Sequence, residues 1–310
     1  MFATGVNPDS RRIAVVGSLN IDTFLPVERN PLPGESVLSG PVSRRAGGKG
    51  ANQAVGCARL GHQVSMVGCL GGDPEGRWLR DRVLAEGVDL SAVATVAEAP
   101  TGAAFILVAQ GESTIVISAG ANGLLEASYV EAQPVIANAD ALLCQLEVPL
   151  GAVQAAVRAA RGLVVLNPAP AQLLPRAILD DVDVLVPNRH ELAAITGSEP
   201  TADLAGIIDC ARSIKVRKAV VVTLGDQGAL AVWEGNAVRI PAVPSVVVDA
   251  TAAGDSFCAG LVDGLLRGMQ LLQAAEWASS VAAITVSRHG AIDSLPFRHE
   301  VVALTAGDAP

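Results

Sequence analysis

The chain has 310 residues and half of them are apolar, so it can bury a large core, and intrinsic disorder is excluded as its main state. The net charge is −9 and no run of Lys or Arg exceeds two residues, which argues against nucleic acid as a partner. The longest stretch without a charged side chain, 162–175, has 14 residues, fewer than a membrane-spanning helix needs. We therefore expect no membrane partner, and because residues 1–9 lack the apolar stretch of a secretory signal, we also expect no such signal.

Cysteine and histidine give no sign of a disulfide framework or of a metal cluster. The cysteines are odd in number, lie far apart and include no C-x-x-C pair: Cys57, Cys69, Cys144, Cys210 and Cys258. The four histidines never stand at metal-ligand spacing. We therefore expect reduced thiols in the core of a soluble, cytoplasmic protein.

Short apolar strands alternate with helical patterns along most of the chain, which predicts an α/β fold with a parallel sheet covered on both faces. The predicted strands are Ile13–Val16, Val64–Val67, Ala141–Cys144, Leu163–Leu166, Val184–Val186 and Ala219–Thr223. The predicted helices are Ala51–Leu60, Trp78–Glu86, Leu150–Arg161, Ala253–Arg267 and Gln273–Val286. Glycines at 260 and 264 predict that the helix 253–267 packs closely against another backbone, because interior glycine otherwise weakens a helix.

Two segments interrupt this alternation. Residues 24–45 are rich in Pro and Gly and show no helical period, and 103–109 and 114–118 form a predicted hairpin with its turn at 110–113. Together they predict a small β appendage, which commonly acts as a lid. Two ordinary surface excursions are the alternative.

The first chemical motif is Asp249-Ala-Thr-Ala-Ala-Gly-Asp255, directly before a predicted helix. Its small residues allow a ligand close to the backbone, and free amides of Ala252, Ala253 and Gly254 would bind an anion at the helix N-terminus. Asp255 lies where it could deprotonate a phosphoryl acceptor. It could equally cap the electropositive end of the helix, and spacing does not choose between these roles.

The second motif is Gly47-Gly48-Lys49-Gly50-Ala51-Asn52, which fails both the P-loop and the G-x-G-x-x-G patterns. What remains is a tight loop with main-chain amides, the Lys49 cation and the Asn52 amide. That set suits a polyhydroxylated ligand as well as a phosphate. A plain turn before a helix is the alternative.

Polar residues also follow several predicted strands, where ligands bind in open α/β sheets. Asn20 and Asp22 come after the first strand, two residues apart, so both would face one side of an extended backbone, and Glu147 follows 141–144. These groups could hydrogen-bond neighbouring sugar hydroxyls. Asn188 and Glu191 form a near capping box, and 223–228 is a glycine-containing turn between strands.

In this order the motifs resemble the ribokinase branch of the phosphofructokinase-B-type sugar kinase family. The resemblance spans Arg12 to Phe297 and rests on Gly47–Ala54, Ala119–Asn122, Asn167–Ala171 and Ala252–Asp255. It implies a ribokinase-like three-layer α/β sandwich with a mainly parallel central sheet and a small β-sheet lid. The implied domains are a catalytic domain of 12–23, 46–100 and 119–310 and a lid of 24–45 and 101–118.

The resemblance implies ATP-dependent phosphorylation of D-ribose at O5, with Asp255 as the base and the amides of Ala252, Ala253 and Gly254 as the anion hole. The implied sugar-binding residues are Asn20, Asp22, Gly48, Lys49, Asn52, Glu147 and Asp255. The implied ATP-binding residues are Asn188, Thr223, Gly225, Asp226, Gln227, Gly228, Gly254 and Ser279. Relatives often have Asn or His where this chain has Ser279 near the adenine.

Cations and a second subunit are also implied by the resemblance. Glu191 would help to hold Mg²⁺ through water, and K⁺ would activate the enzyme at a site made of Asp249, Thr251, Thr285, Arg288, Gly290 and Ser294. The lids of two subunits would clasp in a homodimer.

Three other functions fit the same residues less well. A kinase for deoxyribose, fructose or adenosine would use the same fold, but aromatic residues make up only 3% of the chain, which disfavours a nucleoside base even though Phe24 and Phe105 fall in the predicted lid. A non-catalytic sugar sensor would lack the base or the anion hole. A dinucleotide-dependent oxidoreductase would need G-x-G-x-x-G, which is missing.

Overall fold

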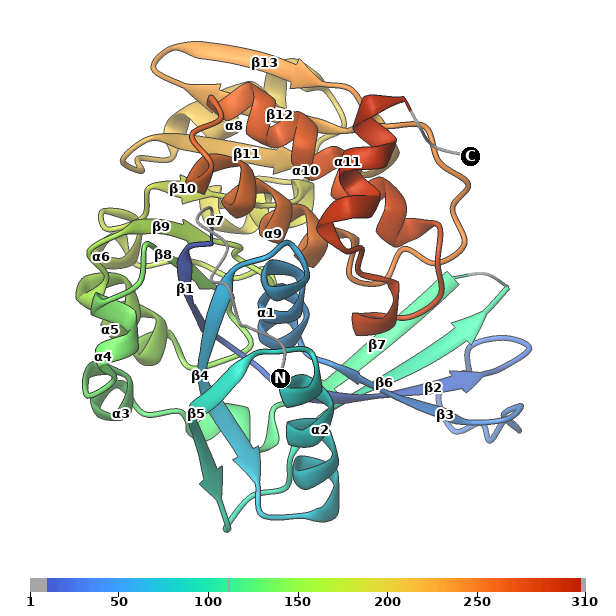
Figure 1. The fold of residues 1–310 in the computed structure, drawn as a ribbon. Coiled ribbons are helices and arrows are strands. Elements are labelled where there is room, and N and C mark those ends of the chain that lie inside the picture. Colours follow the sequence, from blue (N-terminus) through green and yellow to red (C-terminus); the bar gives the residue numbers. More distant parts are fainter. Residues whose placement is uncertain (1–9, 111, 308–310) are drawn as a thin grey trace.

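The computed structural model describes residues 10–110 and 112–307, and its main element is a nine-stranded sheet in the order β13-β12-β11-β10-β9-β8-β1-β4-β5 (Figure 1). Neighbouring strands from β5 to β11 run parallel, while β12 and β13 are antiparallel at one edge. The strands are β1 (Arg12–Val16), β4 (Gln63–Gly71), β5 (Asp89–Val96), β8 (Ala141–Cys144), β9 (Leu163–Leu166), β10 (Val184–Leu185), β11 (Ala219–Thr223), β12 (Ala229–Trp233) and β13 (Asn236–Ile240).

Helices cover both faces of this sheet, because its central strands are apolar on both sides; every residue of β8 is buried. One face packs on α1 (Lys49–Arg59), α2 (Pro74–Ala85), α9 (Ala253–Leu266), α10 (Leu271–Val286) and α11 (Arg298–Ala306). The other packs on α3 (Ala127–Glu131), α4 (Pro134–Ala137), α5 (Leu150–Ala159), α6 (Arg176–Leu179), α7 (Arg189–Thr196) and α8 (Leu204–Ser213). Short 3₁₀ turns are η1 (Gly120–Leu124), η2 (Gly225–Gln227) and η3 (Ile292–Ser294). The predicted α/β class with a mainly parallel sheet is confirmed.

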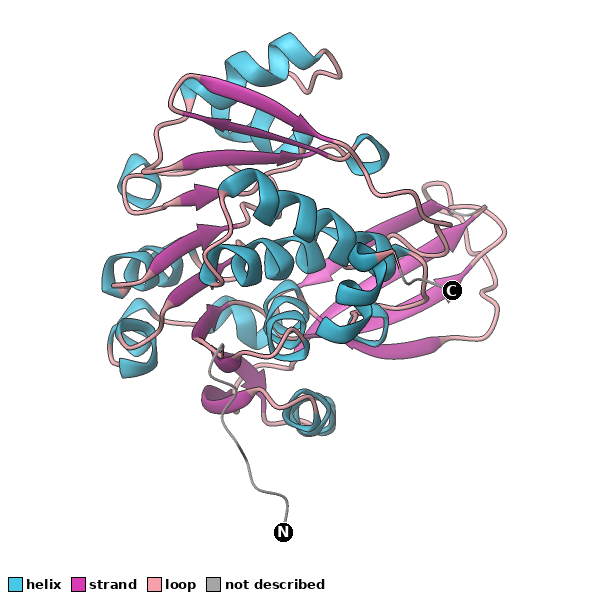
Figure 2. Ribbon diagram, turned by 45° about the horizontal axis from the view of Figure 1, so that its top comes forward, coloured by secondary structure: helices cyan, strands magenta, loops and turns pink. Residues whose placement is uncertain are grey.

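A second, small sheet of four strands projects to one side of the layers (Figure 2). Its order is β3-β2-β6-β7, with β2 (Asn20–Pro26), β3 (Ser43–Gly47), β6 (Gly102–Ala109) and β7 (Glu112–Ser118). The antiparallel pairing of β6 with β7 confirms the predicted hairpin, although Gly111 in its turn lies outside the described residues. The sheet is longer than the predicted appendage, because β2 pairs with β3 from Asn20, opposite Gly47.

The helix that carries Asp255 is anchored along its length. Ideal Cβ atoms on Gly260 and Gly264 would lie 2.9 Å from Cα atoms of α10, so these positions confirm the predicted close packing. Further along α9, the fully buried Asp263 accepts a hydrogen bond from Trp277 of α10 (2.7 Å) and lies 2.9 Å from Nε2 of His62. These contacts tie the middle of α9 to α10 and to His62, which follows α1.

Several predicted boundaries need correction. Helix α1 begins at Lys49 rather than Ala51, and α2 begins at Pro74, where Asp73 caps its amide at Gly76. Helix α10 begins at Leu271, and a further helix, α11, was not predicted; Val301 is its one buried residue. In the described part of the chain, no helix is long and apolar enough to cross a membrane. The expectation about a secretory signal concerns residues 1–9, which lie outside the described residues.

Candidate active site

The N-terminus of α9 is reached through a left-handed residue. Ala252, which precedes the helix, has φ 61°, an unusual value for alanine, and α9 begins at Ala253. The prediction that all three amides of 252–254 are free needs correction: the Ala253 amide donates to the carbonyl of Ala250 at 3.3 Å, because the left-handed residue folds the chain into a turn there. The sharp turn places Asp255 in the first turn of α9, with its side chain buried.

Two neighbouring amides of α1 hold the Asp255 carboxylate. Nδ2 of Asn52 donates to Oδ2, and Nε2 of Gln53 donates to Oδ1, both at 2.9 Å. The carboxylate is therefore bound across a gap of about 200 residues in sequence, rather than acting as a simple cap of its own helix. Asp255 faces α1, the helix that follows the lysine loop, by which we mean the turn Gly47–Gly48 that leads into Lys49, the first residue of the helix.

Gln53 is a site residue that the sequence analysis missed. Its Nε2 also lies 3.3 Å from Oδ1 of Asn167, and its Oε1 accepts a hydrogen bond from Gln145. Because Gln53 is buried and bonded on both ends of its amide, it cannot turn over without breaking this chain of contacts. Helical spacing was the available signal, since residues 49, 52 and 53 fall on one face of a helix.

The polar residues after the first and third predicted strands, Ile13–Val16 and Ala141–Cys144, meet as expected from their positions. Oε2 of Glu147 lies 3.3 Å from Nδ2 of Asn20 and 3.2 Å from the amide of Lys49. Ser18, which was not predicted, also donates to this oxygen, at 2.5 Å. Asn20 accepts a hydrogen bond from Nδ2 of Asn122 at 2.8 Å, which fixes the orientation of its amide. The result is a cluster of buried amide side chains around the half-buried Glu147 carboxylate, beside the lysine loop.

Asp22 belongs to the same cluster and its ionisation is strongly perturbed. Burial, together with the nearby Glu147 and Asp255 carboxylates, raises the pKa of Asp22 to about 7. Burial alone would lower the pKa of Lys49, but the neighbouring carboxylates, above all Asp255 and Glu147, outweigh it and raise that pKa. Because Glu147 and Asp255 act on the ionisation of both Asp22 and Lys49, these four residues form one electrostatic cluster.

Glycine is required where the lysine loop crosses β2. A Cβ on Gly47 would lie 2.0 Å from Oδ2 of Asp22, and one on Gly48 would lie 2.6 Å from the amide of Asn20. Gly48 also has φ 91°, which side chains rarely adopt. The loop can therefore approach the polar end of β2 only because it lacks side chains at these two positions.

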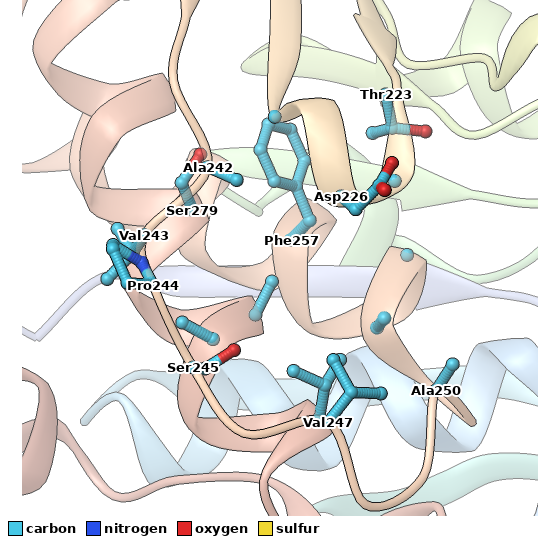
Figure 3. Close-up of a pocket in the computed structure, with 17 residues that line it drawn as sticks. Thr223, Asp226, Ala242, Val243, Pro244, Ser245, Val247, Ala250, Phe257 and Ser279 are labelled. Atoms are coloured by element: carbon cyan, nitrogen blue, oxygen red, sulfur yellow. The ribbon is translucent and has the colours of Figure 1, made fainter.

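A cavity of about 590 Å³ opens on the other side of the α9 N-terminus. Figure 3 shows Val243, Pro244 and Ser245 along one wall and Thr223 and Asp226 across from them. The predicted nucleotide-binding residues that line it are Thr223, Gly225, Asp226, Gly228, Gly254 and Ser279. Its walls are mainly apolar, as is usual for pockets that bind small molecules.

Asn188 and Gln227 are not among the lining residues of this cavity. Asn188 adjoins it through a bridge to Thr223 and caps α7, where its side chain and Glu191 form a capping box. Both oxygens of Glu191 accept hydrogen bonds from Asn188, each at 2.8 Å, and burial raises the pKa of Glu191. The capping interpretation of this motif is therefore correct, whatever further role its acid has.

The residues implied to bind a monovalent cation come from two segments that touch. The Asp249 carboxylate accepts from the amides of Thr251 and Gly290, both at 2.9 Å, and these hydrogen bonds lower its pKa although burial opposes the shift. The side chains of the other three are engaged elsewhere: Thr285 with the Val281 carbonyl, Ser294 with the Ala291 carbonyl and Arg288 with Glu300. Their main-chain carbonyls are the groups that remain suitable for a cation.

Comparison with known proteins places these features in one family. The sequence profile of the pfkB family of carbohydrate kinases matches residues 10–298. The ribokinase of Haemophilus influenzae is 38% identical over 94% of this chain and 97% of its own, and that of Bacillus subtilis is 35% identical over 95% and 99%. The crystal structure of ribokinase from Thermotoga maritima superposes with a TM-score of 0.87 at 34% identity, covering 96% of this chain and 99% of its own. The Arabidopsis thaliana ribokinase structure complexed with ribose and ATP gives 0.86 at 31% identity, with 95% and 98% covered.

Proposed function

The chain belongs to the pfkB family of carbohydrate kinases, and we propose that it transfers the γ-phosphoryl group of ATP to O5 of D-ribose, giving D-ribose 5-phosphate and ADP. The placement of Asp255 carries this proposal. Its carboxylate lies in the same electrostatic cluster as Asp22 and Lys49, and the preceding residue, Gly254, lines the nucleotide cavity. An acceptor hydroxyl and a nucleotide can thus meet at the start of α9.

The polar cluster supplies the groups that a pentose needs. Carboxylate oxygens of Asp22 and Glu147 would accept hydrogen bonds from adjacent hydroxyls, and the amides of Asn20 and Asn52 would donate to them. Oδ1 of Asn52 is buried and has no hydrogen-bond partner among the described residues, so it is available to a sugar hydroxyl. We propose that Gly48 and Lys49 contact the same sugar.

In the transfer step, O5 attacks the γ-phosphorus while Asp255 accepts the O5 proton, the bond to the bridging oxygen breaks, and ADP leaves. The amides of Ala252 and Gly254 would stabilise the transferring phosphoryl group. The Ala253 amide would join them by exchanging its 3.3 Å hydrogen bond to the Ala250 carbonyl for one to a phosphoryl oxygen. We propose that adenine and ribose of ATP occupy the cavity, with Asn188 and Gln227 at its margin and Ser279 on its wall.

The acidic residues present fit Mg²⁺ only in an indirect role. In 10–110 and 112–307 no group of three His, Cys, Asp or Glu residues could hold a metal ion. Glu191 has both oxygens engaged by Asn188, so it would meet the ion through water while ATP phosphates bind it directly. Bound Mg²⁺ would neutralise charge on the transferring phosphates.

The donor set also fits K⁺. One carboxylate, Asp249, stands with main-chain carbonyls on the loop that leads to α9, and oxygen ligands of this kind suit hard cations. We propose that Thr251, Thr285, Arg288, Gly290 and Ser294 complete the site, mostly through their carbonyls. Bound K⁺ would supply positive charge next to the anion hole.

The small sheet would serve as a lid and as a dimer contact. Its outer strand β7 and the adjoining β6 expose Phe105, Ile115, Val116 and Ile117, which range from 43% to 59% exposed. We propose that two subunits cover these side chains on each other. The five cysteines, which form no disulfide in the described part of the chain, suit a reducing compartment, and we propose the cytoplasm.

A substrate panel tests the proposal. ADP formation is measured with ribose, deoxyribose, fructose and adenosine at saturating Mg-ATP, with and without K⁺. We expect the highest kcat/KM with ribose and a clear gain with K⁺. Preference for another acceptor would show that D-ribose is not the main substrate, while the assignment as a kinase would stand. Calorimetric binding of ribose with no ADP formation from any acceptor would instead indicate a sugar sensor.

A further inference from the structure

Arg45 is a charged residue of the small sheet that the site described above does not use. It lies on β3 directly opposite Asp22 of β2, so both side chains point to the same face of the sheet. Its guanidinium lies over the ring of Phe24, which follows Asp22 on that face, at 4.8 Å from the ring centroid. The stacking holds the arginine along the face that turns toward the active site.

The far end of Arg45 reaches the loop before α9. Nη1 lies 4.0 Å from Oδ2 of Asp249, and a Cβ built on Gly290 would lie 2.9 Å from the same nitrogen. The amide of Gly290 itself donates to Oδ2 of Asp249 at 2.9 Å. Arg45 therefore packs on the point where the two segments of the proposed cation site meet, and position 290 leaves room for it by having no side chain.

The neighbouring Arg44 provides a natural contrast. It lies one residue away on the same strand, so its side chain points to the opposite face, where it pairs with Glu75 at 3.4 Å. Its side chain is 65% exposed, whereas that of Arg45 is 30% exposed. One arginine thus faces solvent and the other spans from the small sheet to the loop that carries Asp249.

We propose that Arg45 is a positioning residue that joins the small sheet to the 249–252 segment, so that the position of the sugar-binding strand β2 is transmitted to the start of α9. This inference rests on the proposed function for the claim that sugar binding at β2 affects the start of α9. The contact between Arg45 and the 249–252 segment does not depend on the proposed function.

Hydrogen exchange followed by mass spectrometry tests the contact in the unliganded protein. Variants R45A and R45Q should exchange several-fold faster than wild type in peptides covering 245–252 and 288–292. R44A, the matched control on the same strand, should match wild type there. R45Q keeps most of the side-chain length, so a variant that still folds is available even if alanine loosens the small sheet. Unchanged exchange at 245–252 in both Arg45 variants would overturn the proposal.

D-ribose then tests the transmission. In wild type, ribose should slow exchange both in β2 and at 245–252, whereas in R45A and R45Q it should slow exchange in β2 alone. We expect kcat of both variants to fall about tenfold with less than a threefold change in KM for ribose, and R45K to recover most of kcat. An R44A defect equal to that of R45A, or R45A with normal kcat, would refute the inference while leaving the kinase proposal intact. Absence of sugar-dependent ADP formation in wild type would refute the proposed function without affecting the unliganded comparison.

Discussion

Replacing Asp255 by asparagine separates the chemical role of this carboxylate from its structural role. Each oxygen of Asp255 accepts one amide hydrogen bond, from Asn52 and from Gln53. An asparagine at this position turns one acceptor into a donor, so one of the two neighbouring amides must turn over. Gln53 is bonded at both ends, but Oδ1 of Asn52 has no partner in the described part of the chain, so Asn52 is the one that can rotate.

This rotation keeps the structural cost small. Turning Asn52 exchanges one unpartnered buried atom for another and replaces two charge-assisted hydrogen bonds by neutral ones, a loss of about 1–2 kcal/mol that the removal of a buried charge partly offsets. Loss of the proton acceptor is expected to lower kcat by about 10²–10⁴, which corresponds to about 3–5 kcal/mol in the transition state. The kinetic effect should therefore exceed the effect on stability.

The assay combines steady-state ADP formation with urea denaturation and ribose calorimetry. We expect the D255N variant to fold, to bind ribose within a few-fold of wild type, and to lose at least 99% of kcat. D183N is a suitable control, because Asp183 is also buried and accepts a main-chain amide, but it lies before β10, at the opposite end of the parallel strands from the site. Retention of more than a tenth of wild-type kcat by D255N would remove Asp255 from the proton transfer.

Three further substitutions probe the electrostatics, the anion hole and the support of α9. Burial and neighbouring carboxylates raise the pKa of Asp22 to about 7 from 3.8, so between these two pH values the folded chain holds a proton that the unfolded chain does not. The free energy of unfolding should therefore fall as pH rises through 7. Denaturation at pH 5 and pH 8 should show a smaller fall in Asp22→Asn than in wild type, because the asparagine does not titrate. A Cβ on Gly254 meets open space, so Gly254→Ala should leave the melting temperature within about 2 °C but raise the KM for ATP several-fold, because the methyl group enters the cavity; an unchanged KM would contradict this. Asp263→Ala leaves His62 and the indole of Trp277 without their acceptor and should cost about 3–5 kcal/mol in urea denaturation, with kcat of the folded fraction little changed.

The parts of the fold that the sequence predicts are those set by local patterns. Apolar runs such as Ala141–Cys144 favour central strands, and Gly-Gly-Lys-Gly favours a tight turn at a helix start, although the helix already begins at Lys49 of this motif. The same patterns could not reveal the Gln53–Asp255 bond, whose partners are separated by 202 positions, or the contact of Arg45 with Asp249. Such pairs depend on how elements pack, and a single sequence carries no signal for them.

The anion hole shows the same limit at a smaller scale. Small residues before an apolar helix predict exposed amides at 252–254, and this is the general property of a helix N-terminus. The conformation of Ala252, at φ 61°, is set by the surrounding contacts, and it is this turn that engages the Ala253 amide with Ala250. Composition predicts the kind of site, whereas the Ala253–Ala250 hydrogen bond, which the proposed transfer step would exchange, is visible only in the structure.

The distribution of charge explains how an acidic chain can bind an acidic nucleotide. The cavity walls are mainly apolar and include Asp226, so they contribute little positive charge to a triphosphate. Cationic side chains lie instead toward the sugar cluster, where carboxylates raise the pKa of Lys49 and keep it charged despite its burial. Under the proposed function, much of the charge on the phosphates would therefore be balanced by the N-terminus of α9 and by the proposed Mg²⁺ and K⁺. Because these groups would act at the point of transfer rather than along the whole nucleotide, the proposed arrangement would stabilise the charge that develops in the transition state more than the binding of ATP in the ground state.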